Sequence, residues 1–167
     1  MAESRTTAST IEYETTVFTL PDDSLGPNKA TLLHARTTKT DGSFYKALLY
    51  IHGYSDYYFQ YVDCPYRRNN FHTMFSSDHV CEKFLEQGYD FFALDLRKCG
   101  RSIISPEQTR YRHYFTDIHE YDEEITLSIE HIIKQAKSRP KKLIFYGHST
   151  GTKDRMTTVK RKTLFHK

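Results

Sequence analysis

A short apolar segment that runs into a glycine-flanked serine constrains the fold of this chain more than any other feature. The apolar run Leu143–Tyr146 leads directly into Gly147–Gly151, which reads GHSTG and matches the pattern G-x-S-x-G. Such a run is typical of a buried parallel strand. A serine becomes a useful nucleophile when a sharp strand-to-helix turn exposes its hydroxyl to a base, and glycines on either side leave room for that turn. The pattern therefore predicts a strand that ends by presenting Ser149. The alternative is a glycine-flanked turn with a solvated serine.

Two other segments have the apolar periodicity of amphipathic helices. In Asp78–Gln87, Ser77 can cap the first turn and Gly88 stands where a left-handed C-terminal cap is needed. In Ile118–Lys137, apolar residues recur at steps of three and four, and Asp117 is a suitable N-cap. The sequence therefore predicts one helix on each of these segments.

Five segments rich in apolar or β-branched residues predict strands: Thr15–Leu20, Ala30–Thr37, Lys46–Ile51, Tyr89–Leu96 and Leu143–Tyr146. The first two are separated by turn residues and should form a hairpin. The last three alternate with the helices, which implies right-handed crossovers between parallel strands. We therefore expect an α/β fold with a mostly parallel sheet flanked by helices, and an antiparallel N-terminal hairpin at one edge.

The composition fits one globular domain. The chain has 167 residues, of which 38% are hydrophobic, and this is enough for a single core. No apolar run reaches the roughly 18 residues that suggest a membrane-spanning helix. The N-terminus lacks the apolar core of a signal peptide. These features predict a cytoplasmic protein without a transmembrane segment.

The three cysteines do not predict a disulfide framework, because they are odd in number and irregularly spaced. Reduced thiols are the favoured interpretation. A zinc site built from Cys64, His72, His79 and Cys81 is an alternative, although this spacing matches no usual pattern of zinc ligands. We expect neither a metal nor a cofactor.

Charge is unevenly distributed along the chain. Residues 152–167 contain six basic residues and one acid, a net charge of +5, so the residues before them carry −2 of the overall +3. This contrast separates a divergent basic tail over residues 152–167 from a folded part over residues 13–151. Residues 1–12 are polar and should form a loose N-terminus.

Four motifs follow one another in a set order along the chain. They are the strand end His52-Gly53, the segment Leu94–Ser102 with the sequence LDLRKCGRS, the segment Phe115–Glu123, and Gly147–Gly151. Together they resemble the α/β-hydrolase superfamily, and within it the branch of monoacylglycerol-lipase-like and S33-type serine aminopeptidases. The resemblance covers about residues 15–151 and implies the N-terminal half of that fold.

The resemblance implies a role for each matching residue of the site. Ser149 would be the nucleophile. The backbone N–H groups of Tyr54 and Thr150 would form the oxyanion hole, while their side chains would be incidental. Aromatic residues in the loop that begins at Tyr54 would either line a substrate pocket or pack on the core.

Three other polar residues near these motifs have a structural interpretation. In the family, the histidine of the His-Gly pair is mainly structural and the residue before the nucleophile is not the base, so neither His52 nor His148 should transfer protons. Asp95 ends a predicted strand before a turn and should stabilise that turn. Lys98-Cys99 departs from the family, in which a glycine and a histidine or aromatic residue are usual.

The acid and base of the triad are not identifiable in this chain. The family order places both many tens of residues after the nucleophile. After Gly151, only Asp154 and His166 could serve, and in a helical tail His166 would lie on the order of 25 Å from Ser149. The abrupt change to basic sequence leads us to expect a C-terminally truncated hydrolase, as a shifted reading frame, a retained intron or a mispredicted gene end would produce. The strand Leu143–Tyr146 would then be a sheet edge.

Three functions remain open. The first is a serine hydrolase of the esterase, lipase or aminopeptidase type, which forms an acyl-enzyme with a small ester, lipid ester or amide. The second is a non-catalytic fragment of a hydrolase. The third is a binding module whose basic tail contacts an anionic membrane or nucleic acid. The resemblance favours the first, with a small-molecule ester or lipid substrate and no nucleic acid. It also allows peripheral contact with a membrane.

Overall fold

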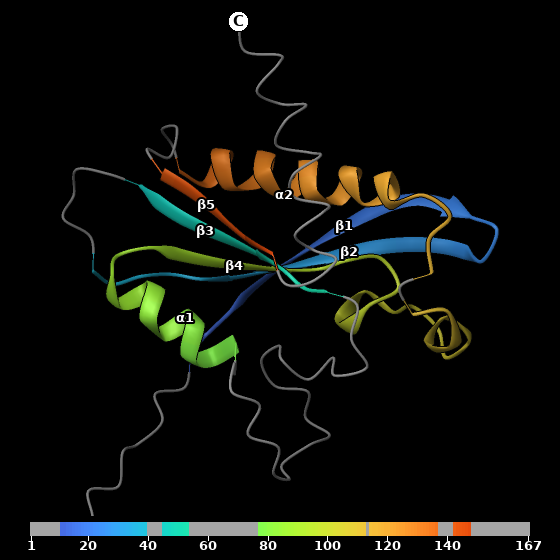
Figure 1. The fold of residues 1–167 in the computed structure, drawn as a ribbon, viewed down its shortest axis with the longest axis horizontal. Coiled ribbons are helices and arrows are strands. Elements are labelled where there is room, and N and C mark those ends of the chain that lie inside the picture. The colour runs from blue at the N-terminus through green and yellow to red at the C-terminus, as the bar shows by residue number, and fades with distance from the viewer. Residues whose placement is uncertain (1–10, 40–44, 54–76, 113, 137–141, 148–167) are drawn as a thin grey trace, which may run out of the picture.

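A five-stranded sheet with a helix on each face forms the described part of the chain (Figure 1). The computed structural model describes residues 11–39, 45–53, 77–112, 114–136 and 142–147. The strands are β1 (Glu14–Asp23), β2 (Gly26–Ala35), β3 (Lys46–Ile51), β4 (Asp90–Asp95) and β5 (Lys142–Gly147). The α-helices are α1 (Ser77–Glu86) and α2 (Asp122–Gln135), and the 3₁₀ helices are η2 (Gly100–Ser102), η3 (Glu107–Tyr111) and η4 (Ile118–Tyr121).

The strand order is β1-β2-β4-β3-β5. The β1–β2 hairpin lies at one edge, and β2 pairs antiparallel with β4. Strand β3 lies between β4 and β5 and is parallel to both. The predicted α/β fold with an N-terminal antiparallel hairpin is therefore confirmed, although the described sheet is mixed, with two antiparallel and two parallel pairings, rather than mostly parallel.

The sheet buries apolar side chains on both faces, and one helix covers each face (Figure 1). Side chains of a strand alternate between the faces, so Leu49 of β3 packs with Ile125 of α2, whereas Leu48 packs with Cys81 of α1. Five of the six residues of β3 and all six of β4 are buried. This two-sided burial explains why both strands are continuous apolar runs in the sequence.

The hairpin differs from its prediction in extent. The predicted first strand ends at Leu20 because Pro21 follows, yet β1 continues to Asp23. Proline lacks an N–H group and is tolerated on edge strands and at bulges, and the β1–β2 register shifts between Leu20 and Asp23. The Asn28 side chain also donates to the Pro21 carbonyl over 3.1 Å. Strand β2 begins at Gly26, whose φ of +100° makes the turn tighter than predicted.

Both predicted helices are present, and two of their predicted end residues can be checked. Asp117 accepts from the His119 N–H in a capping box with Glu120, so the predicted N-cap is confirmed. It caps η4, however, and the α-helical conformation begins only at Asp122. Gly88 follows α1 with a φ of +80°, and a β-carbon there would lie 2.6 Å from the Lys39 carbonyl oxygen. This position therefore requires glycine, as predicted.

Strand β5 is the sheet edge opposite the hairpin among the described residues. Leu143, Ile144 and Phe145 are only half-buried, and Tyr146 is 36% exposed. The neighbouring β3 is far more buried, so the expectation that this strand would be an edge holds within the described part. No helix there is long and apolar enough to cross a membrane.

Candidate active site

The carboxyl ends of the three parallel strands lie side by side. Ile51 is in register with Leu94 on one side and with Gly147 on the other. Neighbouring strands lie about 4.8 Å apart, so Gly53 and the start of the G-x-S-x-G motif leave adjacent strand ends. The structure thus brings together the ends of the two strands that precede the predicted oxyanion-hole residues. The predicted nucleophile Ser149 and the predicted donors, the backbone N–H groups of Tyr54 and Thr150, lie outside the described residues and stay predictions.

His52 joins the ends of β3 and β4. It is 4% exposed, and its Nε2 accepts a hydrogen bond from the Leu96 N–H at 3.2 Å. With Nε2 as acceptor, Nδ1 carries the proton and donates to the Gly53 carbonyl at 3.2 Å. Burial lowers the pKa of His52 from 6.5 to about 4, so the ring is neutral at pH 7. These contacts support the structural role expected for this histidine, since both ring nitrogens bond the backbone.

Asp95 closes the turn that follows β4. Its carboxylate is buried and accepts from the Arg101 backbone N–H at 2.9 Å and from the Arg101 guanidinium at 3.2 Å. Burial raises the pKa of this carboxyl, and Arg101 only partly opposes the rise. Gly100 has a φ of +48°, and a β-carbon there would lie 2.7 Å from Asp95 Oδ2. Asp95 therefore has the turn-stabilising contacts predicted for it.

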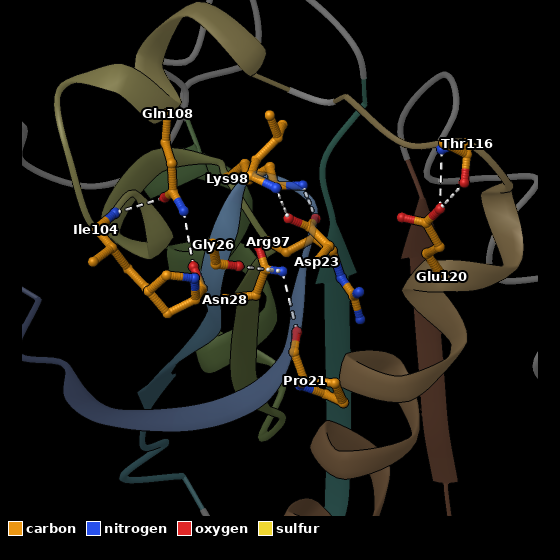
Figure 2. Close-up of polar contacts among 12 residues, drawn as sticks. Pro21, Asp23, Gly26, Asn28, Arg97, Lys98, Ile104, Gln108, Thr116 and Glu120 are labelled. Carbon is orange, nitrogen blue, oxygen red and sulfur yellow. Dashed lines mark hydrogen bonds and ion pairs between the residues drawn. The ribbon is translucent and has the colours of Figure 1, made fainter.

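Lys98 adopts a backbone conformation that favours glycine, with a φ of 58°. The resemblance led us to expect glycine at this position, and the observed backbone conformation is one that glycine adopts more readily than lysine. The lysine side chain is 1% exposed and forms an ion pair with Asp23 at the end of β1 (Figure 2). Sequence reasoning missed this pair, because the partners are 75 positions apart.

Arg97 and Glu124 form a buried ion pair between the end of β4 and the first turn of α2. The Arg97 Nη2 and the Glu124 Oε2 are 2.7 Å apart, with side-chain exposures of 7% and 0%. The Arg97 backbone N–H also donates to Glu124 Oε1 at 3.2 Å. Burial alone would lower the pKa of Arg97, but the bonds and charge of Glu124 outweigh it and raise the pKa. Glu124 was not singled out by the sequence analysis.

A second polar cluster lies at the opposite end of the sheet. His34 Nε2 and Asp90 Oδ2 are 3.0 Å apart, and the Thr37 N–H donates to Asp90 Oδ1 at 2.9 Å. The His34 ring stacks on Phe92 with centroids 4.0 Å apart. Burial opposes ionisation of Asp90, but the bonds from His34 and Thr37 hold its pKa below the usual value. Since Asp90 begins β4, this cluster is separated from the candidate site by the length of the strand.

Most of the other residues weighed for catalysis or metal binding are outside the described ranges. These include His148, Asp154, His166, Cys64 and His72. Cys81 is a buried cysteine on α1 and is not part of a disulfide. Within the ranges that the structure describes, no group of three or more His, Cys, Asp or Glu residues is placed to hold a metal ion.

A family comparison agrees with this architecture. The family model described as serine aminopeptidase, S33, matches residues 71–163, just over half of the chain. A search of curated proteins finds no match.

Several solved structures have a similar fold. The complex of DcsB with its substrate analogue is 16% identical with a TM-score of 0.54, and the match covers 87% of this chain and 41% of that chain. A thermostable carboxyl esterase from Bacillus coagulans is 13% identical with a TM-score of 0.53, covering 86% and 39%. A fungal esterase from Rhizomucor miehei is 16% identical with a TM-score of 0.52, covering 96% and 42%. The chain thus spans about two fifths of each of these structures, and the likeness concerns the fold.

Proposed function

Because the chain belongs to the serine aminopeptidase S33 family, we propose that it is a serine hydrolase acting on carboxylic esters. Its substrates would be small esters, lipid esters or small amides. The observation that carries the proposal is the register of the parallel strands, in which Ile51, two residues before Gly53, pairs with Gly147, the first residue of the G-x-S-x-G motif. His52 supports the same arrangement by bonding the end of β3 to β4.

The proposed reaction is acyl transfer through Ser149. Its hydroxyl oxygen attacks the ester carbonyl carbon while a base takes the proton, and the resulting oxyanion accepts hydrogen bonds from the backbone N–H groups of Tyr54 and Thr150. Collapse of this intermediate leaves an acyl-serine and releases the alcohol, which takes back the proton held by the base. Water then hydrolyses the acyl-serine to the carboxylic acid and free serine. The family order places acid and base after the nucleophile. The described residues end at Gly147, so both partners stay unassigned.

A serine-directed fluorophosphonate probe and a short-chain p-nitrophenyl ester test this proposal together. Wild type should react with the probe and hydrolyse the ester, whereas Ser149→Ala should do neither. Ser24→Ala is the matched control, because Ser24 is an exposed residue of the β1–β2 turn. Equal labelling of wild type and Ser149→Ala would show that the reactive residue is not Ser149.

A non-catalytic hydrolase-like chain is the second candidate. It is favoured by β5, which leads into the nucleophile motif yet is only half-buried, because catalysis needs a nucleophile held rigidly by packed neighbours. Under this alternative, folded wild type would neither label nor hydrolyse, and Ser149→Ala would behave identically. Ester turnover lost specifically in Ser149→Ala would exclude it.

A further inference from the structure

Exposed apolar side chains gather on the segment that follows β4. Ile104, Tyr111 and Tyr114 are 44%, 43% and 47% exposed. The other large hydrophobic residues exposed to this degree in the described part of the chain are Val17, Ile133 and Tyr146, each on a separate element. Exposed apolar residues that cluster in this way mark interaction surfaces more often than scattered ones do.

The same segment presents positive charge. Arg110 and Arg112 are exposed and flank Tyr111 in the sequence. The rings of Tyr111 and Tyr114 meet edge to face, with centroids 6.1 Å apart. We call Ile104, Arg110, Tyr111, Arg112 and Tyr114 the tyrosine–arginine patch. The exposed acid of the segment, Glu107, is at the start of η3, so cations outnumber acids among these exposed residues.

A buried side chain holds this segment in place. Gln108 is 3% exposed, and its Oε1 accepts from the Ile104 N–H at 2.9 Å (Figure 2). Its Nε2 donates to the Pro27 carbonyl in the β1–β2 hairpin at 2.8 Å. The Lys98 ammonium lies 5.8 Å from the centre of the Tyr114 ring. The patch is therefore presented by a segment bonded to the sheet.

The patch lies at the end of the sheet that carries the candidate site. Strand β2 runs antiparallel to β4 with Thr31 opposite Asp95, so Pro27 lies beyond the carboxyl end of β4. Gln108 bonds Pro27, which places η3 beyond that end as well, under the hairpin tip (Figure 1). The carboxyl ends of β3 and β5 are at this same end of the sheet.

We propose that the tyrosine–arginine patch docks this chain on the surface of an anionic phospholipid membrane. Tyrosine rings favour the boundary between headgroups and acyl chains, because one end is apolar and the other forms hydrogen bonds. Arginine forms paired hydrogen bonds with phosphate, and each cation near an anionic surface strengthens binding by about fivefold. Docking goes beyond the proposed hydrolysis because it needs no catalysis. It would hold the candidate site towards a lipid ester.

Vesicle flotation of the full chain tests this proposal. Wild type should bind vesicles of phosphatidylcholine with phosphatidylserine and bind pure phosphatidylcholine vesicles much less. The double variant Tyr111→Ser/Tyr114→Ser keeps the charge and should lower binding by at least about tenfold, given the apolar surface removed. Its matched control is Val17→Ser/Ile133→Ser, which removes two apolar side chains that are 55% and 41% exposed on other elements and should bind like wild type.

A second pair of variants separates the patch from the basic tail. Arg110→Glu/Arg112→Glu and Lys160→Glu/Arg161→Glu change the net charge by the same amount. The patch variant should lose binding, whereas the tail variant should retain more of it. Binding lost mainly in the tail variant would overturn the proposal.

Other results would assign the patch to a different occupant, and each would overturn membrane docking. One is competition by soluble glycerophosphoserine as strong as by vesicles, which would indicate a headgroup pocket. Another is that the wild-type protein does not bind vesicles but self-associates through Tyr111 and Tyr114. Ester hydrolysis by Ser149 is measured separately on a soluble ester, so failure of docking and failure of catalysis are distinguishable.

Discussion

Acidification should destabilise this fold through His52. The ring is neutral in the folded chain, because Nε2 accepts from the Leu96 N–H and burial lowers its pKa from 6.5 to about 4. In the unfolded chain the pKa returns to the ordinary value. Between these two pH values the unfolded state binds more protons than the folded state, so the free energy of unfolding falls as the pH falls.

The size of the effect follows from the pKa difference. A tenfold change in proton affinity corresponds to about 1.4 kcal/mol, so lowering the pKa of His52 from 6.5 to about 4 is worth about 3 kcal/mol. Stability should be independent of this group above pH 6.5, should decrease by about 1.4 kcal/mol per pH unit below it, and should level off near pH 4. Such a loss is a large part of the stability of a small domain.

Comparison with His52→Gln isolates this contribution. The glutamine carbonyl oxygen can accept from the Leu96 N–H, as Nε2 does, but it does not titrate. Urea unfolding followed by far-UV circular dichroism at a series of pH values gives the free energy of unfolding of both proteins. Since the carboxylates are common to both, their contributions cancel in the difference. We expect wild type to lose stability relative to His52→Gln by about 3 kcal/mol from pH 7 to pH 4.

Parallel pH profiles for the two proteins would refute this reasoning. NMR of the imidazole gives an independent readout that does not need cooperative unfolding. The His52 nitrogens should keep the pattern of a neutral ring protonated on Nδ1 from pH 7 down to pH 5. Titration of the ring near pH 6.5 would show that it is not buried as the structure describes.

Three further variants probe other contacts. Glu124→Gln leaves the buried Arg97 without its close carboxylate and should lower the free energy of unfolding in urea by about 3 kcal/mol. The control Glu123→Gln, at a side chain that is 44% exposed, should lower it by less than about 1 kcal/mol. Equal losses would contradict the burial of the pair. Gly100→Ala should lower the free energy of unfolding by more than about 1 kcal/mol in the same assay, because φ is positive here and the alanine β-carbon would meet the Asp95 carboxylate. An unchanged free energy would mean that the turn is built differently. Tyr146→Lys puts a charge on the half-exposed edge strand β5 and should increase the protein remaining soluble after centrifugation; unchanged solubility would show that aggregation does not start at this edge.

Local features of the fold could be predicted because their causes lie within a few residues. Strand β3 has the predicted bounds, Lys46–Ile51, since burial on both faces makes every position apolar. The N-cap at Asp117 and the left-handed Gly88 depend on short-range hydrogen bonding and on sterics. The hairpin bounds were less accurate, because a bulge on an edge strand accommodates Pro21.

The motifs of the candidate site could be recognised in the sequence, but the buried ion pairs near it could not. The sequence alone indicated a strand entering G-x-S-x-G and a structural His52. It did not indicate that Asp23 pairs with the buried Lys98, or that Glu124 pairs with Arg97. A charged residue in a sequence looks much the same whether it is solvated or buried, and only a partner brought close by the fold distinguishes the two.

The sequence by itself determined which segments form strands and helices, and which motif carries the candidate nucleophile. The tertiary structure decided that β4 lies between β2 and β3, and that the ends of β3 and β5 are neighbours. It also decided that the segment around Gln108 is bonded to a hairpin 81 positions earlier. The physical reason is that the type of an element follows from local periodicity. The neighbours of a strand in a sheet depend instead on packing between segments that are distant in sequence, and this packing leaves no local pattern.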